Sequence, residues 1–208
     1  MLQEIFPTPI YMDEVSNRKK ITAEINSAME KIDFKYNESW GKTHRLSDPT
    51  FQENLIQKYG LKHLKDAIAL HVKNYMLGIF KLPPDYDGEL QESYIYQSWI
   101  ALFGKGDYGH IHNHGEADIA GVYYHKKPEG SGDLFFDCPT PGINESVLYS
   151  QHWAPRLSGQ IPEGAILLFP GFLKHGISSN PLDVERVSIS FNIIFDKVNL
   201  YPNSIKVK

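Results

Sequence analysis

The chain has little that would place it among secreted, membrane or nucleic-acid-binding proteins. It has a single cysteine, Cys138, so no disulfide can form within it, and we expect a reducing, cytoplasmic compartment. Residues 1–15 lack the basic start and apolar core of a signal peptide. No stretch approaches the roughly 18 apolar residues of a membrane span. The formal net charge of −4 offers no strong positive field, so we expect neither a membrane nor a nucleic acid as partner.

The N-terminal part of the sequence carries the helical patterns. Apolar residues recur at helical spacing from Asn17 to Ile32, and the pattern is stronger from Leu61 to Phe80. Between them, residues 36–54 are polar and aromatic and predict an irregular connection. The proline pair at 83–84 ends this part, because proline disfavours helix at the residue before it. We therefore expect a helical support over residues 14–82.

The rest of the chain has a β pattern. Short runs rich in Tyr, Ile, Val and Phe alternate with Gly, Pro and Asn turns, which predicts a β core over residues 91–197. Met1–Tyr11 is expected to add an edge strand, where its prolines are tolerated. This predicts an α+β, mainly β fold: a barrel or sandwich with the N-terminal helices packed on one side. The strands are expected near 93–103, 108–113, 119–126, 133–137, 146–150, 165–169, 175–178 and 186–195.

Three histidines form the clearest candidate site. His112 and His114 lie two residues apart, so on a strand they share a face and can point into one cavity. His175 follows a buried strand and a Pro-Gly turn much later in the chain. Imidazole suits iron, zinc, copper and nickel, and three ligands from two segments leave open positions on the ion. The pattern predicts a transition-metal site, although a histidine pair can also be ordinary polar residues at a strand rim.

The segment RVSISFNII, residues 186–194, alternates strictly between polar and apolar residues. Arg186, Ser188, Ser190 and Asn192 would face one side of a strand. A polar face usually lies in water, but a polar face inside a barrel would be a ligand surface. There the planar fork of Arg186 could grip a carboxylate through two hydrogen bonds. The alternative is that Arg186 pairs with a nearby acidic side chain.

Two stretches around the histidines resemble the cupin motifs. Residues 106–118 follow the first motif, with Gly106 before the histidine pair and Asp118 after it. Residues 164–180 resemble the second motif, with the final asparagine one residue late. This resemblance implies a double-stranded β-helix, also described as a jelly-roll or cupin-like barrel.

The sequence also resembles the Fe(II)/2-oxoglutarate-dependent oxygenases, and more narrowly a group of small phage and bacterial members. The resemblance is carried by the opening IFPTPIY, the HxH followed by AGVYY, GDLFFDCP, EGAILLFPGFLKHGISSN and RVSISFN. It implies one oxygenase domain over residues 1–208, with Fe(II) and 2-oxoglutarate as cofactor and cosubstrate. By the family pattern His112 and His175 bind the metal and Arg186 anchors 2-oxoglutarate. Tyr124 stands where related prolyl hydroxylases place a tyrosine that helps to hold 2-oxoglutarate.

The same resemblance places Asn192 toward the substrate. We also expect Ser188 and Asn192 to lie beside the cosubstrate; the alternative for Ser188 and Ser190 is that they are small packing residues. One position departs from the family, because His114 stands where a carboxylate is expected. A three-histidine site is one solution. A second is that Asp118 or Glu116 supplies the carboxylate as alternative or additional ligand, and a third is a degenerate enzyme.

Three functions remain as hypotheses. The first is a 2-oxoglutarate-dependent dioxygenase, a hydroxylase that couples oxidative decarboxylation of 2-oxoglutarate by O2 to C–H oxidation. The second is a cupin-type three-histidine dioxygenase without 2-oxoglutarate, and the third an inactive metal- or ligand-binding barrel. A small molecule or a peptide is the expected substrate, selected by residues 36–54 and 139–157. Leu2–Tyr11 is a candidate edge for oligomerisation.

Overall fold

The computed structural model describes residues 7–139, 147, 156–158, 160–195 and 203–207. Its helices are α1 (Arg18–Met29), α2 (Leu55–Lys58), α3 (Lys62–Phe80) and the short 3-10 helix η1 (Glu38–Trp40). The strands are β1 (Tyr11–Glu14), β2 (Lys35–Tyr36), β3 (Arg45–Leu46), β4 (Ser93–Phe103), β5 (Gly109–His112), β6 (Ile119–Lys126), β7 (Leu134–Asp137), β8 (Arg156–Ser158), β9 (Ala165–Pro170), β10 (His175–Ile177), β11 (Arg186–Ile194) and β12 (Ile205–Val207).

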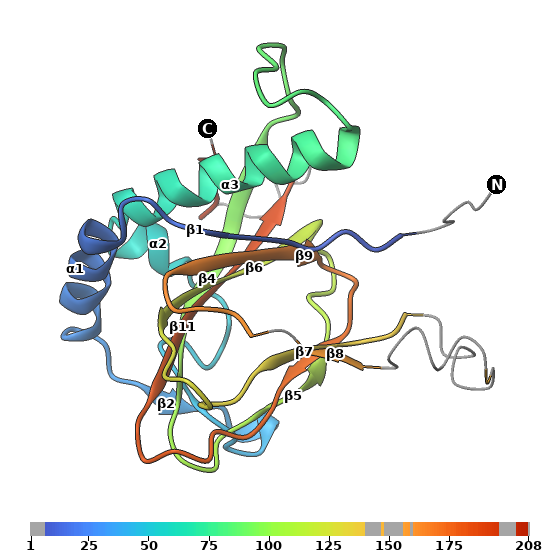
Figure 1. Ribbon diagram of the computed structural model, residues 1–208. Helices are drawn as coiled ribbons and strands as arrows, with labels where there is room; N and C mark the ends of the chain where they lie inside the picture. The colour runs from blue at the N-terminus through green and yellow to red at the C-terminus, as the bar shows by residue number, and fades with distance from the viewer. Residues whose placement is uncertain (1–6, 140–146, 148–155, 159, 196–202, 208) are drawn as a thin grey trace.

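The strands form two antiparallel sheets that make a double-stranded β-helix. The larger sheet has the order β1-β9-β6-β11-β4-β3-β2, with β12 also paired to β4. The smaller sheet has the order β5-β10-β7-β8. Short connections, such as residues 104–108 between β4 and β5 and 171–174 between β9 and β10, carry the chain back and forth between the sheets, so each sheet contains strands that are distant in sequence (Figure 1).

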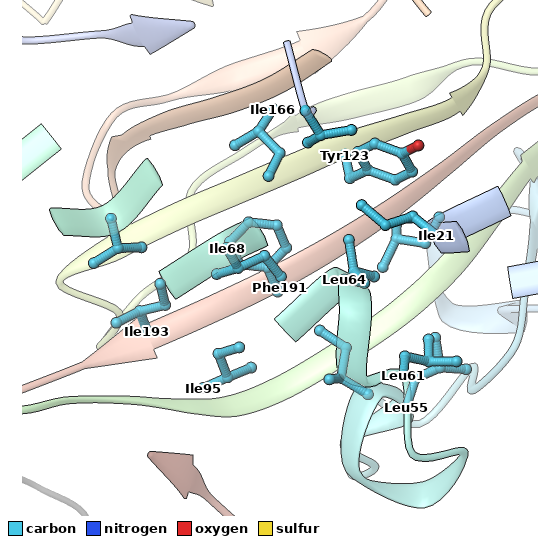
Figure 2. Close-up of a cluster of buried hydrophobic side chains, with 14 of the residues drawn as sticks. Ile21, Leu55, Leu61, Leu64, Ile68, Ile95, Tyr123, Ile166, Phe191 and Ile193 are labelled. Carbon is cyan, nitrogen blue, oxygen red and sulfur yellow. The ribbon is translucent and has the colours of Figure 1, made fainter. Parts of the chain in front are cut away.

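The helices cover one face of the larger sheet. In Figure 1, α1, α2 and α3 lie together on one side of the β core. Apolar residues of the helices and of the facing strands form one buried cluster, because the period-2 alternation of each strand sends every second side chain toward the helices. Figure 2 shows this cluster, with Ile21, Leu55, Leu61, Leu64 and Ile68 from the helical part and Ile95, Tyr123, Ile166, Phe191 and Ile193 from the strands.

Strand β11 shows how this packing defines the interior. Its apolar residues Val187, Ile189, Phe191 and Ile193 belong to the cluster beneath the helices. The intervening Arg186, Ser188 and Ser190 therefore point to the opposite face, where they line a cavity between the two sheets. The polar face of this strand is thus an interior surface rather than a solvent face.

The predicted fold class is confirmed: the protein is α+β, mainly β, with helices on one side. The helices expected over 17–32 and 61–80 are α1 and α3, and the strands over 93–103 and 119–126 have the predicted bounds. The strand expected near 146–150 lies outside the described residues except at position 147. Within the described residues, no helix is both long and apolar enough to span a membrane.

Three expectations about elements were wrong or incomplete. Residues 7–10 are not a strand; β1 instead starts at Tyr11 and pairs with β9 as an edge of the larger sheet, and residues 1–6 lie outside the described part. The connection 36–54 contains η1 and β3, because Asn37 caps η1 and β3 finds its partner in β4. The sequence did not predict the short strands β2, β8 and β12; β2 and β8 pair with the neighbouring strands β3 and β7, whereas β12 pairs with the distant β4.

Candidate metal and carboxylate site

The three predicted histidines come together at one end of the cavity. His112 ends β5 and His175 begins β10, and the two residues are directly paired in the smaller sheet. His114 follows two residues after His112, and its backbone N–H donates to the carbonyl of Gly171 at 2.9 Å. One ligand atom from each of these three residues can be chosen so that all lie within 4.8 Å of one another. The fold therefore brings together ligands that are far apart in sequence.

The orientation of each imidazole is fixed by a hydrogen bond at Nδ1. His112 Nδ1 is 2.8 Å from the carbonyl oxygen of His110, and His175 Nδ1 is 2.9 Å from that of Leu173. These carbonyls can only accept, so each Nδ1 carries the proton and donates, and Nε2 keeps its lone pair. The Nε2 atoms of His114 and His175 are 3.2 Å apart. Two nitrogens bound at about 2.1 Å to one ion at right angles would be about 3 Å apart.

His114 receives its orientation from a side chain instead of the backbone. Its Nδ1 is 2.5 Å from Oδ1 of Asn192. The amide of Asn192 in turn donates from Nδ2 to Oε1 of Gln97 at 2.7 Å. Asn192 therefore lies behind His114 and holds its ring, whereas the sequence analysis had placed it beside the cosubstrate.

Burial keeps all three imidazoles neutral. Burial lowers the pKa of His114 to about 3, helped by the neighbouring His175 and His112. Burial and then His112 lower the pKa of His175 to about 4, and burial also lowers the pKa of His112. A metal ion needs the neutral form of each ligand. At neutral pH the three side chains can thus bind a cation without first losing protons.

Arg186 lies deeper in the same cavity, at the start of β11. Its side chain is fully buried, and none of its three guanidinium nitrogens has a well-formed hydrogen bond with a described residue; the Tyr124 hydroxyl and the Asp133 carboxylate interact with it electrostatically. The guanidinium carbon lies 5.0 Å from the ring centre of Phe103 and 5.3 Å from that of Tyr124. Burial lowers the pKa of Arg186, but a guanidinium keeps its proton in proteins. The expected alternative, an ion pair with a nearby acid, is absent among the described residues.

Two hydroxyl groups accompany this buried cation. Tyr124 is fully buried beside Arg186, and its hydroxyl forms no hydrogen bond with a described residue. Burial raises the pKa of Tyr124 to about 12, against the opposing effect of Arg186, so the hydroxyl remains a donor at neutral pH. Ser188, the next inward-facing residue on β11, also lines the cavity. A buried cation with neutral donors beside it is suited to a carboxylate.

Neither candidate carboxylate ligand belongs to the histidine cluster. The Oδ2 atom of Asp118 accepts the backbone N–H of Phe195 at 2.9 Å, so Asp118 caps the end of β11. Glu116 is exposed and is not part of the cluster. Of the arrangements considered from the sequence, the structure brings together three histidines and no acidic ligand among the described residues.

The cavity wall also includes ring side chains that the sequence analysis did not assign to the site. Trp40, His44 and Phe51 come from the connection between α1 and α2, and Trp99 comes from β4. His44 stacks on Phe103 with ring centres 4.5 Å apart, and burial is the largest cause that lowers its pKa to about 4. The sequence analysis had described residues 36–54 only as a polar and aromatic connection that would help to select the substrate. His44, Phe51 and Trp99 carry no spacing signal, because their proximity arises from the tertiary fold alone.

Comparison with protein families gives one match for this region. Residues 97–192 match the model of a family described as "Putative 2OG-Fe(II) oxygenase", where 2OG denotes 2-oxoglutarate. The match runs from within β4 to β11 and includes the three histidines, Tyr124 and Arg186. A search of curated proteins gives no significant match.

Solved structures share the fold at low sequence identity. The α-ketoglutarate-dependent epimerase SnoN from nogalamycin biosynthesis has a TM-score of 0.59 at 12% identity, covering 90% of this chain and 78% of that one. An oxidoreductase of the 2OG-Fe(II) oxygenase family from Burkholderia pseudomallei has 0.59 at 11% identity, covering 88% and 83%. HygX from Streptomyces hygroscopicus, crystallised with nickel and 2-oxoglutarate, has 0.59 at 12% identity, covering 91% and 84%. These likenesses support the double-stranded β-helix architecture.

Proposed function

We propose that this chain, which belongs through residues 97–192 to the 2OG-Fe(II) oxygenase family, is an Fe(II)- and 2-oxoglutarate-dependent hydroxylase. It would act as a single domain, with residues 14–82 supporting the β core of residues 91–197. The observation that carries the proposal is Arg186, a buried cation without a hydrogen bond to any described residue, in the cavity that the three histidines close. HygX, which has the same fold, was crystallised with 2-oxoglutarate and a metal ion.

In this proposal the Nε2 atoms of His112, His114 and His175 hold the metal. Their Nδ1 protons are engaged by acceptors, so the rings are already turned toward one point before an ion arrives. Three neutral ligands also leave the full charge of a divalent ion in the cavity. With Arg186 the site would carry three positive charges, and a dianionic cosubstrate such as 2-oxoglutarate would neutralise two of them.

The interior face of β11 would hold 2-oxoglutarate. Arg186 would donate two parallel hydrogen bonds to the carboxylate farther from the metal. The hydroxyls of Tyr124 and Ser188 are the neutral donors closest to this position along the strands, since Ser188 is directly paired with Tyr124. Binding would satisfy polar atoms that otherwise lie buried without partners, which is costly in an apolar surrounding.

Together, Fe(II) and 2-oxoglutarate supply the oxidative decarboxylation of the cosubstrate by O2, coupled to oxidation of a substrate C–H bond. The chain's own part is to bind, orient and exclude water. Val122, Leu134 and Ile177 contribute apolar side chains to the wall of the cavity that also contains the histidines and Arg186. Such walls keep water from competing at the reacting centre.

A second candidate is favoured by the absence of a carboxylate from the cluster. A three-histidine dioxygenase that does not use 2-oxoglutarate would employ the same metal ligands. In that case Arg186 would bind a carboxylate of the substrate itself. The two candidates differ in one measurable respect, which is whether 2-oxoglutarate is consumed.

The test is formation of succinate from 2-oxoglutarate in the presence of Fe(II) and air. We expect turnover by the wild-type protein and its loss in His175→Ala and Arg186→Met. Matched controls are His63→Ala, outside the cluster, and Arg18→Met, which removes an exposed ion pair with Glu163. Both controls should keep turnover. Oxygen uptake with a carboxylate substrate but no succinate would favour the second candidate, and full turnover in His175→Ala would refute the first.

A further inference from the structure

An aromatic arc connects two of the proposed metal ligands along the cavity wall. The ring centre of Trp40 lies 5.1 Å from that of His112 and 5.3 Å from that of Phe51. Phe51 lies 5.1 Å from Trp99, which stacks on His114 at 5.9 Å. All three aromatic residues line the cavity. Trp40 and Phe51 lie outside residues 97–192, so the family match assigns them no role.

The backbone of Phe51 adopts a conformation that large side chains rarely adopt. Its φ is +54°, in the left-handed region. Asp48 stabilises this turn: its carboxylate accepts backbone N–H groups from Thr50 at 2.9 Å, Gln52 at 2.7 Å and Glu53 at 2.8 Å. Strained residues held in place by their surroundings are concentrated at functional sites. Here the turn directs an aromatic ring into the cavity, which ordinary core packing does not require.

The Phe51 turn is also linked to the metal site by hydrogen bonds. The side chain of Gln97 donates to the backbone carbonyl of Phe51. The Oε1 atom of the same Gln97 accepts from Asn192, which holds Nδ1 of His114. A continuous chain of polar contacts therefore fixes the position of Phe51 relative to a metal ligand. The same hydrogen bonds therefore position both the aromatic wall and the proposed metal ligand His114.

The charge of the cavity limits what can lie against this wall. Among the described residues that line it, Arg186 is the one permanently charged side chain, and none is acidic. A divalent ion on three neutral imidazoles would add positive charge. The ring centre of Phe51 lies 5.3 Å from that of Trp40 and 5.1 Å from that of Trp99. These rings therefore contact one another and do not form an aromatic cage around a cation. A cationic substrate group is disfavoured here, and Arg186 is already committed to the cosubstrate.

We propose that Trp40, Phe51 and Trp99 form the substrate-recognition wall, and that the substrate presents an uncharged apolar group, aromatic or aliphatic, to it. Phe51 and Trp40 are the specificity-determining residues contributed by the helical half of the chain. This assignment rests on the proposed function, since it places the oxidised group between the wall and the metal.

The proposal is tested by binding three probes of similar size and different charge: phenol, tetramethylammonium and benzoate. Each is titrated calorimetrically into the anaerobic protein loaded with Fe(II) and 2-oxoglutarate, and also into the metal-free protein. Phenol should bind the loaded wild-type protein more tightly than either ion. Its dissociation constant should rise about tenfold in Phe51→Ala and in Trp40→Ala, the loss expected for one aromatic contact. Phe80→Ala, which removes an exposed ring at the end of α3, should bind like wild type.

The outcomes separate the wall from the proposed function. Tighter binding of tetramethylammonium or benzoate than of phenol would overturn the proposal, as would no phenol binding by the wild type or unchanged binding in both wall variants. If Phe51→Ala does not fold, as judged by circular dichroism, Trp40→Ala and Phe51→Leu carry the test. If phenol binds to a protein that neither binds nor consumes 2-oxoglutarate, the proposed recognition wall stands and the proposed hydroxylase function is refuted.

Discussion

Replacing Arg186 by methionine should change stability and ligand binding in opposite directions. The guanidinium is fully buried and has no well-formed hydrogen bond to any described residue, so the ligand-free protein bears the desolvation cost of a charge that Tyr124 and Asp133 offset only in part. Methionine has a similar length, fills the same space and carries no charge. We therefore expect Arg186→Met to be as stable as the ligand-free wild type or more stable, by about 1–3 kcal/mol.

When 2-oxoglutarate is present, the wild type should instead be more stable than Arg186→Met. At a concentration of 100 times the dissociation constant, a ligand that binds only the folded state stabilises it by about 2.7 kcal/mol. For a chain of this size that corresponds to a rise of roughly 5–10 °C in melting temperature. Loss of two charge-assisted hydrogen bonds of about 1.5–3 kcal/mol each should weaken binding at least 100-fold in Arg186→Met. The variant should then show almost no thermal shift.

The assay is thermal unfolding of the metal-loaded protein, anaerobically, with and without 2-oxoglutarate. Arg186→Lys is the matched comparison, because it keeps the charge but not the planar fork, and it should retain part of the shift. Arg18→Met, at an exposed ion pair, should behave like wild type within about 1 kcal/mol. Equal 2-oxoglutarate shifts in wild type and Arg186→Met would refute the reasoning about the buried cation.

Three other changes test separate parts of the account. Asn192→Leu removes the acceptor that orients His114 and should lower Co(II) affinity about 10- to 100-fold in an optical titration. Asn113→Ala, at an exposed position, is the control, and equal Co(II) affinities of Asn192→Leu and the wild type would argue against this role. Gly132→Ala should lower the unfolding free energy by about 2–4 kcal/mol in a denaturant titration, because φ is +87° and the new Cβ would lie 2.4 Å from a backbone oxygen; a cost below about 0.5 kcal/mol would contradict the geometry. Burial lowers the pKa of His44 from its ordinary value of 6.5 to about 4 in the folded protein, so its contribution to stability is complete above pH 6.5 and is lost as pH falls toward 4. Between pH 6.5 and 4 the free energy of unfolding of the wild type should fall by up to roughly 3 kcal/mol more than that of His44→Gln. Parallel pH dependences of the unfolding free energy in the two proteins would count against a buried neutral His44.

The sequence predicted those parts of the fold whose signals are local. The alternation over residues 186–194 identified β11 and placed Arg186 on its polar face, but only the structure shows that this face points inward. The two-residue spacing of His112 and His114 placed both in one cluster. The contacts of Asn192 were not predictable, because strand alternation gives the face of a residue but not its partner. Asn192 shares the face of Arg186, yet its amide is engaged by His114 and Gln97.

Asp118 also shows that a sequence pattern does not give the partner of a side chain. Its position after the histidine pair suits a metal carboxylate, but the chain turns so that its side chain caps the end of β11. The aromatic wall was beyond sequence reasoning for a different reason. Phe51 reaches the cavity through a left-handed backbone conformation that the residue type itself disfavours. That conformation depends on Asp48 and Gln97, whose contacts exist only in the folded chain.

The most direct test of the central claim is an anaerobic titration of the metal-free protein with Fe(II), followed by 2-oxoglutarate, recorded by visible absorption. Members of the family that the sequence resembles are expected to develop a weak visible band when metal and 2-oxoglutarate are both bound. We predict that the band appears in wild type at one equivalent of iron, weakens in Arg186→Met and is absent in His175→Ala. Iron binding in wild type without a band, and without any affinity for 2-oxoglutarate, would contradict the assignment of Arg186 as a cosubstrate anchor.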